Sequence, residues 1–315
     1  MRDGTFQKAQ NVLAKFLPQT RLVLCSSLQR FAEQKVFLKL ESELPTGSFK
    51  VRGAIYALSM QERPAGTREV VASSTGNHGA AVAYAAQVLG WKARIFLPEK
   101  NNPVKRGNIE RLGAAIQEKG AIDLVGAFEA ASEYARKTGA FFLNDATDPD
   151  LPAGPGTIAC EILEQQSEVE AIYVPMGDTA LIRGVASAAR QISRGVKIIG
   201  VQSERAPSYV LSWKEGRPIE TETCDTIADG LATRMPVAAN VAAIRELVDD
   251  VALVSEEELL GAIGRLLLDE HVVAEPAGAA ATAAFLKSKC MRRRVVLLVT
   301  GANISKNVLR KAAES

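Results

Sequence analysis

Histidine and cysteine are scarce in this 315-residue chain, and neither forms a cluster. The two histidines, His78 and His271, make no H-E-x-x-H motif and have no spacing typical of a zinc site. The G-x-S-x-G turn of many serine hydrolases is also missing. The four cysteines lie far apart without a C-x-x-C pair, which predicts free thiols in a reducing cytoplasm rather than a disulfide framework or a metal site.

The sequence also lacks an excess of one charge and any long apolar run. With 38 basic and 36 acidic residues the formal charge is only +2, so no broad positive field is available for a nucleic-acid partner. No stretch of about 18 apolar residues occurs, and the first residues contain no continuous hydrophobic segment. We therefore expect a soluble cytoplasmic protein with neither a nucleic-acid nor a membrane partner.

Short apolar, β-branched segments alternate with longer alanine-rich segments of helical period. This alternation predicts an α/β protein whose mainly parallel strands are covered by helices. Ser255 followed by Glu258 forms a capping box, which predicts the start of a helix. The polar stretch 144–156, rich in proline and glycine, predicts a boundary between two lobes. The eight expected strands are 36–40, 69–73, 93–97, 114–118, 171–175, 197–202, 250–254 and 295–299.

Two glycine-containing turns have the sequence context of an anion site. Residues 70–79 and residues 172–181 each run from an apolar segment through small polar residues into a helical segment. The N-terminus of a helix favours an anion because its backbone N–H groups are unpaired and its dipole is positive there. A tight strand-to-helix turn with a serine or asparagine cap explains the same pattern without a ligand, so both interpretations stay open. The G-x-G-x-x-A match at 154–159 is a weak dinucleotide fingerprint, because no convincing strand precedes it.

Lys50 stands in the segment Ser-Phe-Lys-Val-Arg-Gly-Ala at 48–54; taken alone, a lone lysine is usually a solvated surface charge. Together with the Ser-Thr-Gly-Asn-His turn at 74–78 and the Gly177 turn, this segment resembles the fold type II, or β-family, of pyridoxal-phosphate enzymes. Within that family the chain is similar to the serine/threonine dehydratase and serine racemase branch. The segments 154–157, 226–231, 275–278 and 300–303 extend the resemblance over nearly the whole chain.

The resemblance implies pyridoxal 5'-phosphate as the cofactor, carried as a Schiff base on Lys50, whose amine then acts as the base for the substrate α-proton. It implies that Asn77 hydrogen-bonds the 3-hydroxyl of the cofactor and that Thr300 faces the ring nitrogen. The turn implied to bind the substrate carboxylate consists of Ser74, Thr75, Gly76, Asn77 and His78. The other implied cofactor contacts are Phe49, Gly177, Asp178, Thr179, Ala180, Leu181, Gly230 and Glu275.

The function implied by the resemblance is that of an ammonia-lyase, which dehydrates and deaminates a β-hydroxy-α-amino acid of the threonine or serine type to a 2-oxo acid and ammonia. A neutral hydroxyl partner such as Thr300 does not favour ring protonation, and this favours loss of a β-leaving group. One alternative is an amino-acid racemase that uses Lys50 and Thr75 on opposite faces of the substrate. Another is a dehydratase for a bulkier substrate, such as phenylserine, hydroxyaspartate or a hydroxyectoine-derived compound. A cofactor-binding protein without turnover, and an ordinary α/β protein with purely structural turns, also stay open.

Three features depart from the family pattern. Asp178 lies in a turn that is usually a run of glycines, and a carboxylate beside a phosphate is repulsive, so we expect its side chain to turn away, toward the substrate entrance or a base such as Arg183. Thr75 stands where dehydratases tend to have alanine and racemases serine, and we expect it to pack rather than to donate a proton. Gln202 and Ser208 replace two carboxylates of the divalent-cation site of the racemase branch, so metal activation is not expected.

The resemblance also implies two lobes with the cofactor between them. We expect a large domain formed by residues 1–68 and 147–315, and a small domain, residues 69–146, that closes over the substrate. By analogy with the family, we expect a homodimer.

Overall fold

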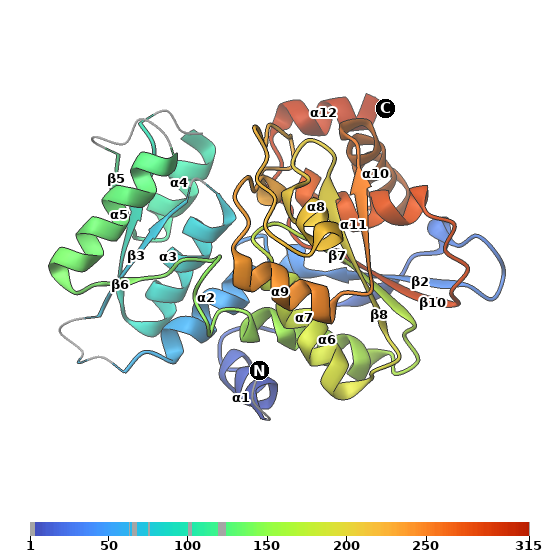
Figure 1. Ribbon diagram of the computed structural model, residues 1–315, viewed down its shortest axis with the longest axis horizontal. Helices are drawn as coiled ribbons and strands as arrows, with labels where there is room; N and C mark the ends of the chain where they lie inside the picture. The colour runs from blue at the N-terminus through green and yellow to red at the C-terminus, as the bar shows by residue number, and fades with distance from the viewer. Residues whose placement is uncertain are drawn as a thin grey trace.

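The computed structural model contains two sheets, each with its own helices (Figure 1). It describes residues 4–62, 64, 68–74, 76–99, 103–118 and 124–314. The large sheet has the strand order β1-β2-β10-β7-β8-β9, and the small sheet has the order β5-β4-β3-β6. Within the described residues β1 pairs antiparallel with β2, and the other strand pairs are parallel. The strands are β1 (Leu22–Leu24), β2 (Lys35–Leu40), β3 (Glu69–Ser73), β4 (Lys92–Phe96), β5 (Ala115–Gln117), β6 (Phe141–Phe142), β7 (Ala171–Pro175), β8 (Lys197–Ser203), β9 (Asp250–Val254) and β10 (Arg294–Val299).

Helices cover both faces of each sheet. One core of the large sheet contains residues of α10, α11 and α12, and the opposite core contains residues of α6 to α9. The small sheet packs against α2 and α3 on one face and against α5 on the other. The α-helices are α1 (Thr5–Leu13), α2 (Lys50–Ser59), α3 (Asn77–Leu89), α4 (Pro103–Arg111), α5 (Leu124–Thr138), α6 (Ala153–Gln165), α7 (Ala180–Ile192), α8 (Ser208–Glu215), α9 (Ala238–Leu247), α10 (Glu256–Glu270), α11 (Pro276–Lys287) and α12 (Lys306–Glu314).

Strand β10 shows why its residues form a central strand. Side chains alternate between the two faces of a sheet, and β10 has an apolar residue at every position after Arg294. Val295, Leu297 and Val299 therefore enter one core, whereas Val296 and Leu298 enter the other. Complete burial of such a side chain contributes roughly 1.5–3 kcal/mol, so this run is stable only when helices cover both faces.

The prediction of an α/β fold with mainly parallel strands is confirmed. All eight expected strands are present, and their ends agree with the prediction to within one residue. Strands β1 and β6 were not expected; they are only 3 and 2 residues long. The capping box is also confirmed, because the Ser255 hydroxyl accepts from the backbone N–H of Glu258 and the Glu258 carboxylate accepts from that of Ser255.

The stretch 144–156 is a loop only in its first part, because α6 begins at Ala153. Residues 143–152, which precede the helix, contain no strand, so the glycines at 154 and 156 do not belong to a strand-to-helix dinucleotide turn. A Cβ on Gly154 would lie 2.3 Å from the carbonyl oxygen of Arg52. Glycine at this position therefore allows α6 to pack directly against α2.

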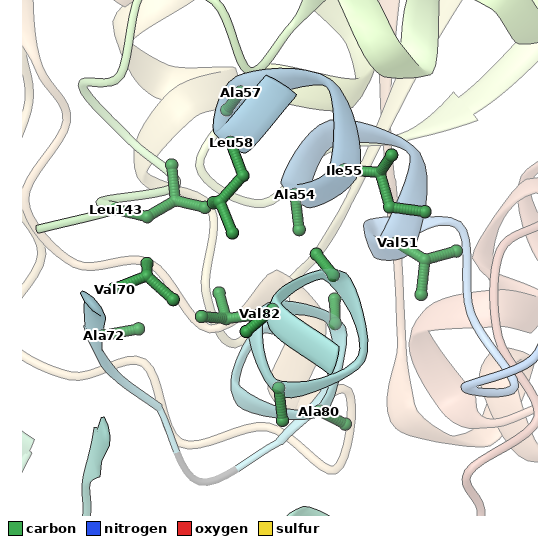
Figure 2. Close-up of a cluster of buried hydrophobic side chains, with 14 of the residues drawn as sticks. Val51, Ala54, Ile55, Ala57, Leu58, Val70, Ala72, Ala80, Val82 and Leu143 are labelled. Carbon is green, nitrogen blue, oxygen red and sulfur yellow. The ribbon is translucent and has the colours of Figure 1, made fainter. Parts of the chain in front are cut away.

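Helix α2 packs with one side on α3, at the junction between the two sheets (Figure 1). Figure 2 shows Ala54 and Leu58 of α2 directed toward Val82 of α3 and Val70 of β3. These side chains are buried in one cluster, and the small alanines let the two helices approach closely. This packing holds α2 against α3 and, through it, against the small sheet.

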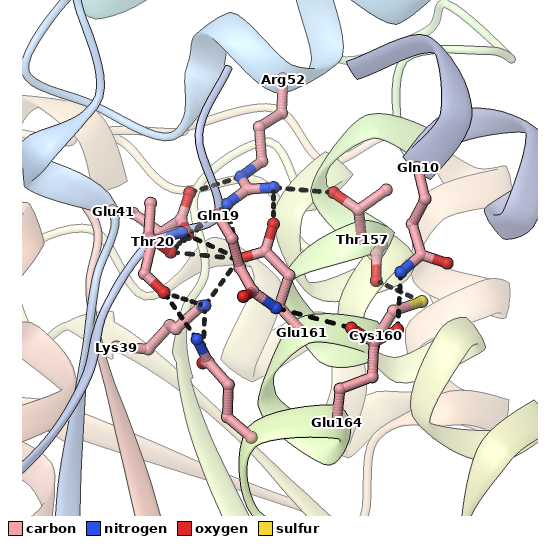
Figure 3. Close-up of polar contacts among 12 residues, drawn as sticks. Gln10, Gln19, Thr20, Lys39, Glu41, Arg52, Thr157, Cys160, Glu161 and Glu164 are labelled. Carbon is pink, nitrogen blue, oxygen red and sulfur yellow. Dashed lines mark hydrogen bonds and ion pairs between the residues drawn. The ribbon is translucent and has the colours of Figure 1, made fainter. Parts of the chain in front are cut away.

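A buried ion network holds the other side of α2 to the large sheet (Figure 3). Arg52 donates to both carboxylate oxygens of Glu41, at 2.7 and 2.9 Å, and to both of Glu161, at 2.6 and 3.0 Å. Lys39 on β2 donates to Glu161 at 2.6 Å and to the carbonyl of Thr20 at 2.8 Å. Two cations thus face two carboxylates, and each charge has hydrogen-bonding partners, as buried ions require. The position of α2 is consequently fixed from both sides.

Candidate active site

A pocket opens where the carboxyl ends of β3, β7 and β10 meet the start of α2. In open α/β sheets, ligands bind at this edge because loops and helix N-termini converge there. The pocket, with its open mouth, contains about 620 Å³ of space that protein atoms do not fill. Its lining residues are Phe49, Lys50, Gly53, Asn77, His78, Asp145, Leu151, Pro155, Pro175, Gly177, Asp178, Thr179, Ala180, Leu181, Gly230, Leu231, Glu275, Ala277 and Thr300.

Lys50 is the first residue of α2 and is held beside Thr300 by the backbone. The N–H of Phe49 donates to the carbonyl of Thr300 at 3.0 Å, and Ser48 forms a β-bridge with Gly301. The Lys50 Nζ donates to Asp145 Oδ2 at 2.7 Å. Burial lowers the pKa of the Lys50 amine, but the carboxylates of Asp145, Asp178 and Glu275 together outweigh burial and hold this pKa above its ordinary value.

Asp145 was missed by the sequence interpretation, which treated its segment as a boundary loop. Burial opposes its ionisation, but the Lys50 ammonium holds the pKa of Asp145 well below its usual range. His78 Nδ1 lies 3.9 Å from Asp145 Oδ2, and His78 Nε2 is 3.0 Å from the carbonyl oxygen of Leu143. Because burial lowers the pKa of His78, this imidazole is neutral near pH 7 and Lys50 is the cation that Asp145 meets.

The side chain of Asn77 is oriented by two partners. Its Nδ2 donates to Glu275 Oε1 at 2.6 Å, and its Oδ1 accepts from Asn303 Nδ2 at 2.8 Å. Asn303 also donates to the carbonyl of Thr46 at 2.9 Å, which ties this segment to the loop before Lys50. The sequence interpretation included Asn303 in a motif but gave it no role. Asn77 can still donate its second amide hydrogen into the pocket.

Only part of the turn expected to bind the substrate carboxylate lines the pocket. Asn77 and His78 line it, whereas the described residues Ser74 and Gly76 do not. The Ser74 hydroxyl instead accepts from the backbone N–H of Gly76 at 3.2 Å. Thr75, to which both packing and proton donation were assigned as alternatives, lies outside the described residues.

The Gly177 turn leads into the N-terminus of α7. A Cβ on Gly177 would lie 2.3 Å from the carbonyl oxygen of Gly230, so only glycine permits this close approach. Thr179 is the N-cap of α7 and has a φ of 70°, which is rare for a β-branched residue. Its side chain makes no capping hydrogen bond to the helix N–H groups. The first backbone donors of α7 are therefore available to an anion in the pocket.

The left-handed conformation of Thr179 predicts a measurable strain. We expect Thr179→Gly to be more stable than Thr179→Ala by about 1 kcal/mol, because a Cβ disfavours this conformation by that order. Both variants remove the hydrogen bond that Arg183 Nε donates to Thr179 Oγ1 at 3.1 Å, so they differ only in the Cβ. Urea unfolding of the two variants measures the difference. Equal stabilities would show that the backbone carries no strain at this position.

The expectation for Asp178 was right in part. Its carboxylate does turn to a hydrogen-bonding partner, but that partner is Thr233, whose hydroxyl donates to Asp178 Oδ1 at 3.1 Å, rather than Arg183. Arg183 instead donates to the Thr179 hydroxyl at 3.1 Å and to the carbonyl of Ala146 at 3.3 Å. Burial, together with the charge of Asp145, raises the pKa of Asp178 to about 6.

The donor set of the pocket fits pyridoxal phosphate. Lys50 supplies a primary amine for an aldehyde, and the uncapped start of α7 supplies N–H donors for a phosphate. The Thr300 hydroxyl, which makes only a long 3.5 Å contact with the carbonyl of Ala277, has capacity for a ring nitrogen. The close approach of the Gly177 and Gly230 backbones, which a Cβ at either position would disturb, shapes this side of the pocket.

The two side chains that replace cation ligands are used by the protein itself. Gln202 accepts from the backbone N–H of Val210 at 3.0 Å, and Ser208 donates to the carbonyl of Thr233 at 2.6 Å. Among the residues that the structure describes, no group of three or more His, Cys, Asp or Glu side chains could hold a metal ion.

All four cysteines are free. No helix in the described ranges is both long enough and apolar enough to cross a membrane.

Comparison with known proteins identifies the family. The family model described as pyridoxal-phosphate dependent enzyme matches residues 13–301. An L-threonine ammonia-lyase of Thermotoga maritima is 39% identical over 307 residues, which cover 96% of this chain and 76% of that enzyme. The structure of maize serine racemase is similar with a TM-score of 0.91 and 28% identity, covering 98% of this chain and 96% of that one. Threonine deaminase isoform 2 from Solanum lycopersicum has a TM-score of 0.91 and 30% identity, covering 100% of this chain and 88% of that one.

Proposed function

Because this chain belongs to the pyridoxal-phosphate-dependent enzyme family, we propose that it dehydrates and deaminates a β-hydroxy-α-amino acid to a 2-oxo acid and ammonia. The family resemblance noted from the sequence is confirmed, and the chain is a pyridoxal-phosphate-dependent ammonia-lyase of the serine/threonine dehydratase type. One observation carries the proposal. The Lys50 amine, the uncapped N-terminus of α7 and the Thr300 hydroxyl line the same pocket.

The residues have distinct tasks in this reaction. Lys50 would hold the cofactor aldehyde, the start of α7 its phosphate, Asn77 its ring hydroxyl and Thr300 its ring nitrogen. When bound, the cofactor supplies an electron sink that acidifies the substrate Cα–H and permits loss of the β-hydroxyl.

Lys50 Nζ is the base in the pocket. It takes the α-proton, and Asp145 stabilises the ammonium form that results. Loss of the β-hydroxyl as water leaves an enamine, which becomes an imine and is hydrolysed to the 2-oxo acid and ammonia. The Asn77 turn is proposed to hold the substrate carboxylate during these steps.

A substrate panel tests the proposal. Holoenzyme is incubated with serine, threonine, threo- and erythro-3-hydroxyaspartate and phenylserine, and 2-oxo acid and ammonia are measured together. We expect equal amounts of both products from at least one substrate. A protein that holds the cofactor yet releases no 2-oxo acid from any β-hydroxy amino acid would instead be a cofactor-binding protein without lyase activity.

Racemisation is the second candidate, because Thr75 has a hydroxyl where racemases have serine. Chiral analysis of the substrate that remains in the same panel separates the two reactions. Inversion faster than 2-oxo acid release would make racemisation the main activity.

The assembly, location and domain organisation follow from the same family. We propose a homodimer in the cytoplasm, with residues 69–146 as a small domain that closes over the substrate. The lining of the pocket supports this division, because Asn77 and Asp145 come from the small part and Gly177 and Thr300 from the large part.

A further inference from the structure

The described lining of the pocket is rich in negative charge. Asp145, Asp178 and Glu275 all act on the ammonium of Lys50, which is the one lysine or arginine among the described lining residues. These three carboxylates outnumber the single ammonium group of the described lining. A cofactor phosphate and a substrate carboxylate add further negative charge, so the family chemistry alone does not account for these acids.

Glu275 has a task within the cofactor site. Its Oε1 accepts from Asn77 at 2.6 Å, and the residue stands at the N-terminus of α11, where the helix dipole favours a carboxylate. Its charge therefore belongs to the machinery that orients Asn77. Asp145 pairs with Lys50 but loses this partner when the amine is engaged with the cofactor, and Asp178 has no task in the proposed reaction.

Asp145 is held firmly beside the reacting centre. The loop that carries it is fixed on its far side, because the carbonyl of Ala146 accepts from Arg183 at 3.3 Å and from Asn240 Nδ2 at 3.0 Å. The Asp145 Oδ2 atom is 2.7 Å from Lys50 Nζ, the atom that must reach the substrate Cα. A group attached one or two bonds beyond the substrate Cβ can therefore reach this carboxylate.

Asp178 lines the same pocket from the turn between β7 and α7. Thr233 fixes its carboxylate, and its charge repels that of Asp145 across the pocket. Two carboxylates that repel each other through a partly dry space are stabilised by a cation between them. Lys50 meets this need only while its amine is free and protonated, and it cannot do so when the amine is engaged with the cofactor or serves as the base.

We propose that the pocket selects β-hydroxy-α-amino acids whose side chain ends in an ammonium group, with Asp145 as the main partner of that group and Asp178 as a second. This inference rests on the proposed function and names its substrate class. A 2,4-diamino-3-hydroxy acid is the shortest member of the class. Its ammonium replaces Lys50 as the counter-ion of Asp145.

Binding is tested without turnover by a matched pair of ligands. The ligands 2,4-diaminobutanoate and 2-aminobutanoate differ only in the side-chain ammonium, and neither has a β-hydroxyl to eliminate. We expect titration calorimetry of the holoenzyme to show at least ~10-fold tighter binding of the diamino ligand, as a charge-assisted hydrogen bond provides. Equal or tighter binding of 2-aminobutanoate would overturn the proposal.

Asp145→Asn keeps the shape of the side chain and removes its charge, so we expect it to abolish most of the preference. Asp150→Asn is the matched control: it makes the same change in the same loop, but residue 150 is not among the pocket residues, and the preference should persist. Melting temperature and cofactor content verify that both variants are folded and loaded. An unchanged preference in Asp145→Asn would contradict the assigned role.

Turnover gives a second measurement. We expect kcat/KM for 2,4-diamino-3-hydroxybutanoate to exceed that for threonine, and the ratio to fall at least ~10-fold in Asp145→Asn. An equal loss for both substrates would assign Asp145 only to positioning Lys50 and would overturn the proposal. If no substrate yields a 2-oxo acid, the proposed lyase function is wrong. The difference in binding between 2,4-diaminobutanoate and 2-aminobutanoate would still test whether the pocket selects an ammonium group.

Discussion

Replacement of Lys50 by arginine is expected to lower kcat/KM for 2-oxo acid release by ~10⁴-fold or more. Arginine keeps the positive charge that faces Asp145, so the ion pair and the start of α2 are preserved. A guanidinium, however, neither forms the link to an aldehyde nor loses a proton in the working pH range. The variant therefore removes the chemistry of the amine while it retains the local electrostatics.

Covalent labelling locates this effect at Lys50, and a circular-dichroism melting curve shows whether the variant is folded. Borohydride reduction followed by mass analysis should leave the cofactor on the unchanged protein at Lys50 and none on Lys50→Arg. Lys214→Arg, at an exposed lysine near the end of α8, is the control and should keep both the label and the activity. Substantial 2-oxo acid release by Lys50→Arg would refute the mechanism.

Replacement of Glu161 by glutamine is expected to lower the free energy of unfolding by about 3–5 kcal/mol, the cost of breaking a buried ion pair. Glu161 accepts hydrogen bonds from Arg52, Lys39 and Thr20, and an amide group would place a donor against these donors. Lys39 is fully buried and would be left with neutral hydrogen-bonding partners, the carbonyl of Thr20 and the side chain of Gln165. Urea unfolding at pH 7 measures the loss.

Glu164→Gln, one turn further along α6, is the matched control. Glu164 is exposed, so the same change should alter the free energy of unfolding by less than about 0.5 kcal/mol. Similar losses in the two variants would mean that the buried network is not the cause.

The effect of Glu161 should also depend on pH with a definite sign. Burial raises the pKa of Glu161, but Arg52 and Lys39 outweigh burial and hold it below the ordinary value of 4.5. A depressed carboxylate pKa contributes stability above the unfolded value, and this contribution is lost as pH falls through the folded value. The difference between the unchanged protein and Glu161→Gln should therefore shrink when unfolding is measured below pH 4.5.

The eight expected strands could be predicted because each is a short apolar run between polar or glycine-containing segments. Strand β1 could not be predicted, because three residues are too few to show an alternation of apolar and polar side chains. Its extended conformation depends on antiparallel pairing with β2. The two-residue β6 is likewise defined only by its pairing with β3.

The site residues that match family segments, such as Lys50 and Thr300, could be named from the sequence. Asp145 could not, because its partner Lys50 is 95 residues away and no local pattern marks the pair. The same holds for Thr233, which meets Asp178 from 55 residues away. The positive φ of Thr179 could not be predicted from the sequence either, because a β-branched residue disfavours that conformation.

The double attachment of α2 has a mechanical consequence. The helix is fixed to the large sheet through Arg52 and to the small sheet through its packing on α3. A helix attached to both sheets lies near the axis of any rotation between them. Atoms near a rotation axis move least for a given angle. Any swing of one part of the molecule against the other therefore displaces the distant walls of the pocket more than the amine of Lys50. In such a swing the reactive nitrogen would stay in place while the space around it would change.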